Sequence, residues 1–240
     1  MDAEQKVLFD QITGEAAAYY KSVCALDATN QWELNEDSDD IKIYVRQDPA
    51  SGLRMTRAET TFNIRLPLIK EALQFGSDML EWDRSLCAYD VLQQIENYKV
   101  SCSLSTKVTM VTQREAILVD KTIEMEDKSV LIVGKSIYHD SFPADPDYVT
   151  ADVSLLAWHL MPVENKPDET KIVYILHVDP KGWIPTSLFN LGVQEEAKKV
   201  QLLRKYLEDK KTQSCDQEGT TAAENKISSS SETQPKEILV

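Results

Sequence analysis

Between residues 86 and 178 the chain repeats one pattern, in which an apolar or alternating segment is followed by a short polar turn. The segments lie at residues 86–95, 98–104, 115–125, 130–138, 148–163 and 171–178. Segments of this kind are typical of strands, and the Asp, Asn and Pro residues between them are typical of turns. Because no helical segment separates them, consecutive strands must run largely antiparallel. The sequence therefore predicts a large antiparallel sheet.

Helical periodicity appears on both sides of this series. Near the N-terminus, apolar residues recur at steps of three and four, which predicts a helix with one apolar face. The residues of this face are Leu8, Ile12, Ala16, Tyr19, Val23 and Leu26. A second stripe of this kind predicts a long C-terminal helix from Pro185 to about Lys210. The residues of the second stripe are Phe189, Val193, Ala197, Val200, Leu203 and Leu207.

Three further strands and a helical insert are predicted between the first helix and the sheet series. The strands are expected at residues 32–34, 41–46 and 53–64, and the helical insert begins after Pro67. The acidic loop at residues 35–40 is superficially similar to a calcium loop. It lacks the central glycine and the distant glutamate of such a loop, so a solvated turn is favoured.

Composition restricts the classes of function. The chain has 240 residues and 42 % hydrophobic residues, enough for a sizeable core. Its formal net charge of −14 argues against a nucleic-acid-binding surface and against tight docking on anionic membranes. We therefore expect no nucleic-acid partner, and we expect any membrane contact to be transient.

The four cysteines lie far apart in the sequence, which favours free thiols over a disulfide framework. The first residues lack the basic start and apolar stretch of a signal peptide, and no apolar run approaches 18 residues. We therefore expect a soluble, cytoplasmic protein, and we expect it to be a monomer.

Catalytic signatures are weak. Gly134-Lys-Ser136 is similar to the end of a phosphate-binding loop, but an apolar strand segment precedes it in place of a glycine-rich turn. The three histidines, His139, His159 and His177, have no metal-ligand spacing, and strand alternation predicts that His159 and His177 point to opposite faces of the sheet. We therefore expect no catalytic residues, no metal and no other cofactor.

A sharp corner joins the last predicted strand to the C-terminal helix. It is formed by Asp179-Pro-Lys-Gly-Trp-Ile-Pro185, in which Asp179 and Pro180 end the strand and Gly182 supplies a flexible turn. Three other motifs accompany this corner. They are Glu81-Trp-Asp-Arg84, Arg114-Glu-Ala-Ile117 and Tyr148-Val-Thr-Ala-Asp-Val153.

In this order and spacing, the corner and the three motifs resemble the START (steroidogenic acute regulatory protein-related lipid transfer) domain family. The resemblance covers residues 1–211. It implies an α+β helix-grip fold, in which a curved antiparallel sheet of about nine strands wraps around a long C-terminal helix. An N-terminal helix and a helical insert after the third strand complete this fold. Residues 212–240, rich in Ser, Thr, Gln, Glu and Lys, are expected to form a disordered tail.

The resemblance also implies a set of lipid-binding residues. In the family, contacts lie two, four and six residues before the aspartate that ends the ninth strand, and period-two alternation extends the set to neighbouring strands. The expected lipid-binding residues are Ala116, Leu118, Ser154, Leu156, Trp158, Val173, Ile175, His177, Phe189, Val193 and Val200. The expected gate consists of Gly182, Trp183, Ile184 and Pro185. Alternation alone does not distinguish a lined cavity from a solid core.

Two features bear on the lipid headgroup. The positions that resemble the aromatic cage of choline-binding family members hold Ala116 and Ser154, with Ser103 a third candidate, so the sequence does not favour phosphatidylcholine. Sterol-binding members place an acid and an arginine in the cavity, whereas here Asp120 stands at the arginine position and the sequence shows no clear partner for it.

The resulting hypothesis is non-enzymatic binding and transfer of one lipid, a phospholipid, a sterol or a related molecule. The cavity would lie between the sheet and the C-terminal helix, with the helix and the adjoining loops as a gate. An alternative is a lipid-sensing adaptor that recruits partners through its tail. An enzyme built on the same scaffold is a less favoured third possibility, because the sequence shows no convincing pair of nucleophile and base.

Overall fold

The computed structural model describes residues 1–38, 40–184, 192 and 195–212. It contains helices α1 (Ala3–Val23), α2 (Leu66–Phe75) and α3 (Met79–Trp82), and residues 195–212 form the C-terminal helix. The strands are β1 (Glu33–Asp37), β2 (Lys42–Gln47), β3 (Arg54–Phe62), β4 (Leu86–Ile95), β5 (Tyr98–Ser105), β6 (Arg114–Glu124), β7 (Val130–Ser136), β8 (Val149–Thr150), β9 (Asp152–Val163) and β10 (Lys166–Asp179).

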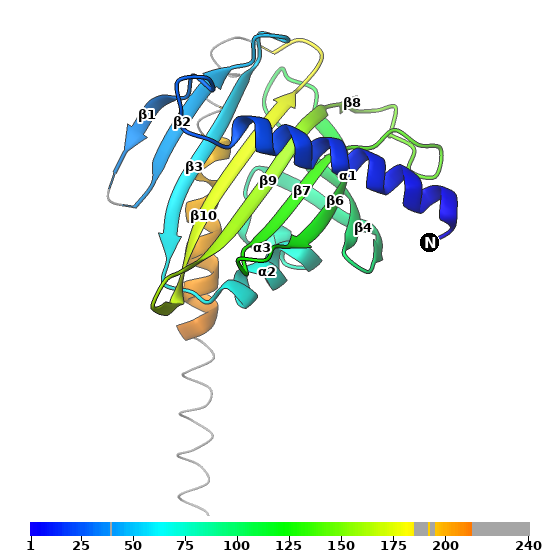
Figure 1. Cartoon of the computed structure of the whole chain (residues 1–240). Helices are drawn as coiled ribbons and strands as arrows, with labels where there is room; N and C mark the ends of the chain where they lie inside the picture. The colour runs from blue at the N-terminus through cyan, green and yellow to red at the C-terminus, as the bar shows by residue number, and fades with distance from the viewer. Residues whose placement is uncertain (39, 185–191, 193–194, 213–240) are drawn as a thin grey trace, which may run out of the picture.

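The strands form one curved sheet in the order β1-β2-β3-β10-β9-β7-β6-β5-β4. All neighbours on this path are antiparallel, and the two-residue β8 pairs with β6 in parallel. Figure 1 shows α1 crossing one face of the sheet, and the C-terminal helix, drawn in orange, on the opposite face. The predicted helix-grip architecture is confirmed.

Helix α1 begins where the Asp2 carboxylate accepts a hydrogen bond from the Gln5 backbone N–H at 2.7 Å. Its buried residues are Phe9, Thr13, Ala16, Tyr20 and Val23. The predicted stripe is therefore partly wrong, because Leu8, Ile12 and Tyr19 are only half-buried and Leu26 lies exposed beyond the end of the helix. Apolar residues occupy two adjacent lines along α1, and only packing against the sheet selects the one that is buried.

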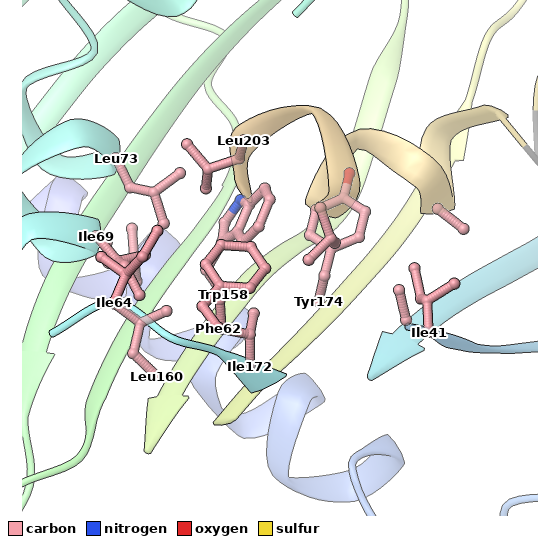
Figure 2. Close-up of a cluster of buried hydrophobic side chains, with 14 of the residues drawn as sticks. Ile41, Phe62, Ile64, Ile69, Leu73, Trp158, Leu160, Ile172, Tyr174 and Leu203 are labelled. Atoms are coloured by element: carbon pink, nitrogen blue, oxygen red, sulfur yellow. The ribbon is translucent and has the colours of Figure 1, made fainter. Parts of the chain in front are cut away.

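Apolar side chains fill both faces of the central strands. On the α1 face, Ala16 and Tyr20 pack with Leu155, Val173 and Ile175. On the opposite face, a larger cluster joins β3, β9 and β10 to α2 and to the C-terminal helix. Figure 2 shows Trp158 and Tyr174 rising from the sheet toward this helix, next to Phe62 and Leu203. The central strands are thus covered on both sides.

Ion pairs also hold the described part of the C-terminal helix. Its basic side chains reach acids on both flanks, in α3 and its flanking turns and near strands β1 and β2. The pairs are Lys199–Asp83, Lys210–Asp78, Arg204–Asp40 and Lys198–Glu36. The apolar residues Ala197, Val200 and Leu203 are fully buried beneath the same segment. Residues 195–212 are therefore firmly fixed to the sheet.

A polar relay ties α1 to β9. The Ser129 hydroxyl donates to Asp127 Oδ1 at 2.6 Å, and Ser129 Oγ lies 3.0 Å from His159 Nε2. The other ring nitrogen, Nδ1, lies 2.8 Å from the Tyr20 hydroxyl. Because the serine proton goes to Asp127, Ser129 accepts from Nε2–H, and Nδ1 accepts from Tyr20. All members of the relay are satisfied when His159 is neutral.

A second relay of the same order ties α1 to β10. The Ser51 hydroxyl donates to Asp48 Oδ2 at 2.6 Å, His177 Nε2 lies 3.5 Å from Ser51 Oγ, and His177 Nδ1 lies 3.0 Å from the Tyr19 hydroxyl. Both His159 and His177 therefore face α1, and the prediction that they point to opposite faces is wrong. In each relay the serine hydroxyl donates its proton to a loop aspartate and not to the histidine, so the arrangement differs from a serine–histidine nucleophile pair.

The two relays predict a stability that depends on pH. Burial lowers the pKa of His159 and of His177, and the nearby Asp127 and Asp48 carboxylates oppose this only partly. The unfolded chain then binds more protons than the folded chain, so the free energy of unfolding should decrease as pH falls below the ordinary histidine pKa of 6.5. The slope is at most about 1.4 kcal/mol per pH unit for each histidine.

Urea denaturation between pH 7.5 and 5.5 measures this slope. The double variant His159→Asn/His177→Asn should lose most of it, because the titrating groups are gone. A His139→Asn variant is the control, since His139 is exposed and outside both relays. An equal slope in all three proteins would contradict the assignment.

Candidate ligand cavity

A cavity of about 560 Å³ lies between the sheet and the C-terminal helix. Its wall is largely apolar and comes from the sheet, from α2 and α3, from the β5–β6 loop and from the corner after β10. The apolar lining residues are Leu73, Met79, Trp82, Leu86, Val108, Val111, Ala116, Leu118, Ile132, Val153, Leu156, Trp158, Tyr174, Leu176, Val178 and Ile184. The space beneath the helix is therefore partly open and not a solid core.

The wall contains five of the residues that the sequence predicted to bind lipid or to form the gate. Ala116 and Leu118 lie on β6, Leu156 and Trp158 on β9, and Ile184 in the corner. The binding role of these residues stays a prediction. Three of the other residues, Phe189, Val193 and Pro185, lie outside the residues that the structure describes.

The prediction of which β10 residues face the cavity is wrong, because the cavity-facing positions are shifted by one residue. Val173 and Ile175 pack beneath α1, and His177 contacts Tyr19, whereas Tyr174, Leu176 and Val178 line the cavity. Strand β10 is central and covered on both faces, so its sequence is apolar at nearly every position and alternation does not reveal which face is which. The spacing taken from the family decided which residues of β10 were expected to face the cavity. It selected the residues that face α1.

Ser154 and Val200 also lie away from the cavity wall. On β9, Leu155 pairs with His177 while Val153 pairs with Val178, so Ser154 is the extra residue of a β-bulge. The bulge restores Val153 to the cavity side in place of Ser154. Val200 is fully buried in the core between the helix and the sheet. A bulge has no reliable sequence signal here, since Ser and Val both occur within strands.

A buried ion pair stands on the cavity wall. Lys99 of β5 lies opposite Asp120 of β6, with Lys99 Nζ 3.6 Å from the carboxylate and 2.7 Å from the Leu73 carbonyl oxygen, to which it donates. Lys99 is therefore the partner of Asp120 that the sequence did not reveal. Burial alone would lower the pKa of Lys99, but Asp120 and Tyr89 outweigh it and raise this pKa. Burial raises the pKa of Asp120, and Lys99 opposes that rise.

The absence of a side chain at Gly134 leaves room for the Asp120 Cβ and the β6 backbone. Gly134 lies opposite Asp120 on β7, and a Cβ atom there would stand 2.7 Å from the Asp120 Cβ and 3.0 Å from the Val119 carbonyl oxygen. The Gly134-Lys-Ser136 motif therefore lies within a strand, as expected from the apolar residues that precede it. Its glycine permits a close approach of two strands at the cavity wall.

A second cationic group, Lys199 of the C-terminal helix, lies at the helix side of the cavity. Its Nζ is 3.0 Å from Asp83 and 2.7 Å from Glu196. Burial would lower the pKa of Lys199, but these two carboxylates raise it. Asp83 also accepts hydrogen bonds from the backbone N–H and the hydroxyl of Ser85. The Trp-Asp motif therefore contributes a buried wall residue, Trp82, and an anchor for the helix.

Arg114 joins the two loops at the mouth of the cavity. Its guanidinium donates to the carbonyl oxygens of Pro180 at 3.1 Å, Lys181 at 2.8 Å and Trp183 at 3.3 Å, and to that of Thr112. The corner turns at Gly182, whose φ of +60° lies in the left-handed region that glycine adopts without steric cost. One side chain therefore fixes the corner after β10 against the start of β6.

Large apolar side chains are exposed around the same mouth. Met110 and Val108 lie in the β5–β6 loop, where Met110 is 85 % exposed, and Trp183 in the corner is 68 % exposed. Within the described part of the chain, no helix is long and apolar enough to cross a membrane. Nor do the described residues include a cluster of three or more His, Cys, Asp or Glu side chains placed to hold a metal ion.

A curved antiparallel sheet that encloses an apolar cavity beneath a C-terminal helix defines the helix-grip class of proteins. Within this class, the model of the START domain matches residues 14–204. The match covers most of the chain, so the chain belongs to the START domain family.

Curated relatives are consistent with this assignment. The mitochondrial steroidogenic acute regulatory protein of Danio rerio is 24 % identical over 181 residues, which are 72 % of this chain and 62 % of that protein. The Bos taurus protein of the same name is 26 % identical over 145 residues, 59 % of this chain and 50 % of that protein. The chain thus spans about half to two thirds of the length of these two relatives.

Solved structures share the fold. Human StAR-related lipid transfer protein 5 superposes with a TM-score of 0.76 at 15 % identity, covering 85 % of this chain and 98 % of that one. A StAR-related lipid transfer protein fragment from Xanthomonas axonopodis gives a TM-score of 0.63 at 21 % identity, covering 74 % and 98 %. At these identities the likeness is one of fold.

The close approach at Gly134 predicts a stability loss. Gly134→Ala should lower the free energy of unfolding by about 1–3 kcal/mol, because the new methyl group must displace Asp120 or the β6 backbone. Gly14→Ala is the matched control. Its Cβ would meet nothing within 4 Å in the middle of α1, so it should raise stability by about 0.5–1 kcal/mol. Urea denaturation measures both changes, and equal effects of the two substitutions would contradict the packing argument.

Proposed function

We propose that this protein is a non-enzymatic carrier that binds one lipid molecule in the cavity and transfers it between membranes. The observation that carries the proposal is the largely apolar cavity of about 560 Å³ beneath the C-terminal helix. Membership in the START domain family supports it, as does the likeness to a human protein named for lipid transfer. We further propose that the carrier domain comprises residues 1–211 and works in the cytoplasm as a monomer.

Burial of the lipid supplies the binding free energy. A lipid that loses several hundred Å² of apolar surface to such a wall gains on the order of 10 kcal/mol before the costs of association. Such a gain is sufficient for tight binding without any chemical step. Affinity then comes from the apolar wall, and selectivity from its few polar groups.

The size of the cavity favours a compact lipid. Pockets for one small organic ligand usually enclose roughly 300–1,000 Å³, and a cavity of about 560 Å³ lies within this range. It therefore suits a sterol or a lipid with one chain better than a phospholipid with two long chains.

Entry requires the mouth to open, and we base our proposal for the part that moves on the contacts that hold each element. Residues 195–212 of the C-terminal helix are fixed by buried side chains and by ion pairs on both flanks. The corner at Gly182 and Trp183 is held mainly by hydrogen bonds from Arg114 to backbone carbonyl oxygens. We therefore place the gate at this corner and the β5–β6 loop, and not in a swing of the whole helix.

The exposed side chains at the mouth would make the membrane contact. Met110 and Trp183 are apolar, and tryptophan is favoured at the interface between lipid and water. The formal net charge of −14 opposes lasting attraction to an anionic surface. Contact of this kind is brief, which suits a carrier that must leave the donor membrane.

Transfer of a fluorescent sterol between vesicles tests the membrane contact at the corner. Trp183→Ala should lower the initial rate by roughly fivefold, because an interfacial side chain worth about 1 kcal/mol is lost. Leu34→Ala is the matched control, since Leu34 is similarly apolar and exposed but lies on β1. Equal rates for the two variants, with intact circular dichroism spectra, would show that the corner is not the membrane contact.

Deletion of residues 212–240 separates the carrier from the alternative of a lipid-sensing adaptor. Residues 213–240 lie outside the described part of the chain, and the proposal gives the whole tail no part in transfer. The shortened protein should therefore transfer lipid at the rate of the full chain. A shortened protein that still binds lipid but no longer retains a cellular partner would favour the adaptor.

A further inference from the structure

The charges on the cavity wall bear on the class of lipid. Four cationic side chains lie on the wall formed by the described residues, namely Arg54, Lys99, Arg114 and Lys199. A cation inside a cavity binds an anionic headgroup only if its charge is not already neutralised. The existing partners of each cation therefore decide whether a phosphate or a carboxylate could be held.

The deepest cations are neutralised by carboxylates. Lys99 Nζ lies 3.6 Å from the Asp120 carboxylate and donates a hydrogen bond to the Leu73 carbonyl oxygen. Both charged residues are almost fully buried. Lys199 faces two carboxylates, those of Asp83 and Glu196. The first pair is neutral overall, and the second group carries an excess negative charge. An anion placed beside either would be repelled by a carboxylate.

The two arginines lie at the mouth and the rim and not in the deep part of the cavity. The Arg114 guanidinium donates to four backbone carbonyl oxygens at the mouth. Arg54 is exposed at the rim, where water and salt screen its charge. The other polar groups of the interior are uncharged, and Ser101, Ser103 and Ser105 place a row of them along β5. Hydroxyl groups of this kind suit the hydroxyl or carbonyl oxygen of a neutral ligand.

We propose, on the basis of the carrier function above, that the cavity takes uncharged lipids and rejects anionic ones. Asp120 is the residue that determines this specificity, because it is the one carboxylate paired with Lys99, whereas the other deep cation, Lys199, is paired with two. Gly134 contributes to the same specificity, because the absence of its side chain leaves room for Asp120 beside Lys99. The ligand is then a lipid whose polar groups are hydroxyl or carbonyl oxygens.

Competition among lipids in one vesicle tests the class. The delipidated full chain is incubated at pH 8 with vesicles that hold equal mole fractions of phosphatidylcholine, phosphatidylserine, oleic acid, oleyl alcohol, monooleoylglycerol and cholesterol. Mass spectrometry of the re-isolated protein should show the uncharged lipids enriched at least roughly tenfold over oleate and phosphatidylserine. Enrichment of oleate or of either phospholipid overturns this inference but leaves the carrier function intact. Uptake of no lipid at all overturns the carrier function itself.

Three variants test the role of Asp120. Asp120→Asn frees the Lys99 charge, so the ratio of bound oleate to oleyl alcohol should rise at least roughly tenfold through a gain of oleate. The double variant Lys99→Gln/Asp120→Asn has no charge at this point and should keep the wild-type ratio. Glu196→Gln is the matched control, because Asp83 still neutralises Lys199.

An unchanged ratio in a folded Asp120→Asn protein would overturn the role of Asp120. Should that variant not fold, Asp120→Ser carries the same expectation, since it also frees Lys99 with a small neutral side chain. The wild-type selectivity decides the lipid class in either case.

Discussion

Burial of both faces of the central strands is the constraint on which the rest of this structure depends. Strands β9 and β10 are covered by α1 on one side and by the C-terminal helix on the other. On the α1 side the contact is completed by two hydrogen-bonded relays. On the helix side, side chains as large as Trp158 and Tyr174 rise from a curved sheet, and packing is incomplete. The cavity is the space that remains.

The same arrangement explains why charged groups can occur inside. A buried ion is tolerated only with a partner, and each buried cation of the wall has carboxylates or carbonyl oxygens beside it. These contacts also join elements far apart in the sequence. Lys199 links the C-terminal helix to the turn after α3, and Arg114 links β6 to the corner after β10. Polar contacts thus position the mouth and the helix that close the cavity.

Much of the architecture could be predicted from local sequence. The strand segments from residue 86 onward, the corner at residues 179–184 and the element order of the START family agree with the structure. Prediction was weaker where a strand or helix carries apolar residues on more than one face. The phase of β10, the stripe of α1 and the displaced Ser154 depend on which neighbours cover each face and on one bulge. Local periodicity carries no information about either.

The sequence by itself determined the order and type of the elements, because hydrophobic period and turn chemistry act over a few residues. Only the tertiary structure decided which side chains face the cavity and which charges meet. Asp120 and Lys99 are 21 positions apart, and their contact follows from the antiparallel register of β5 and β6. Register and sheet curvature arise from the packing of the whole chain, so no short segment encodes them.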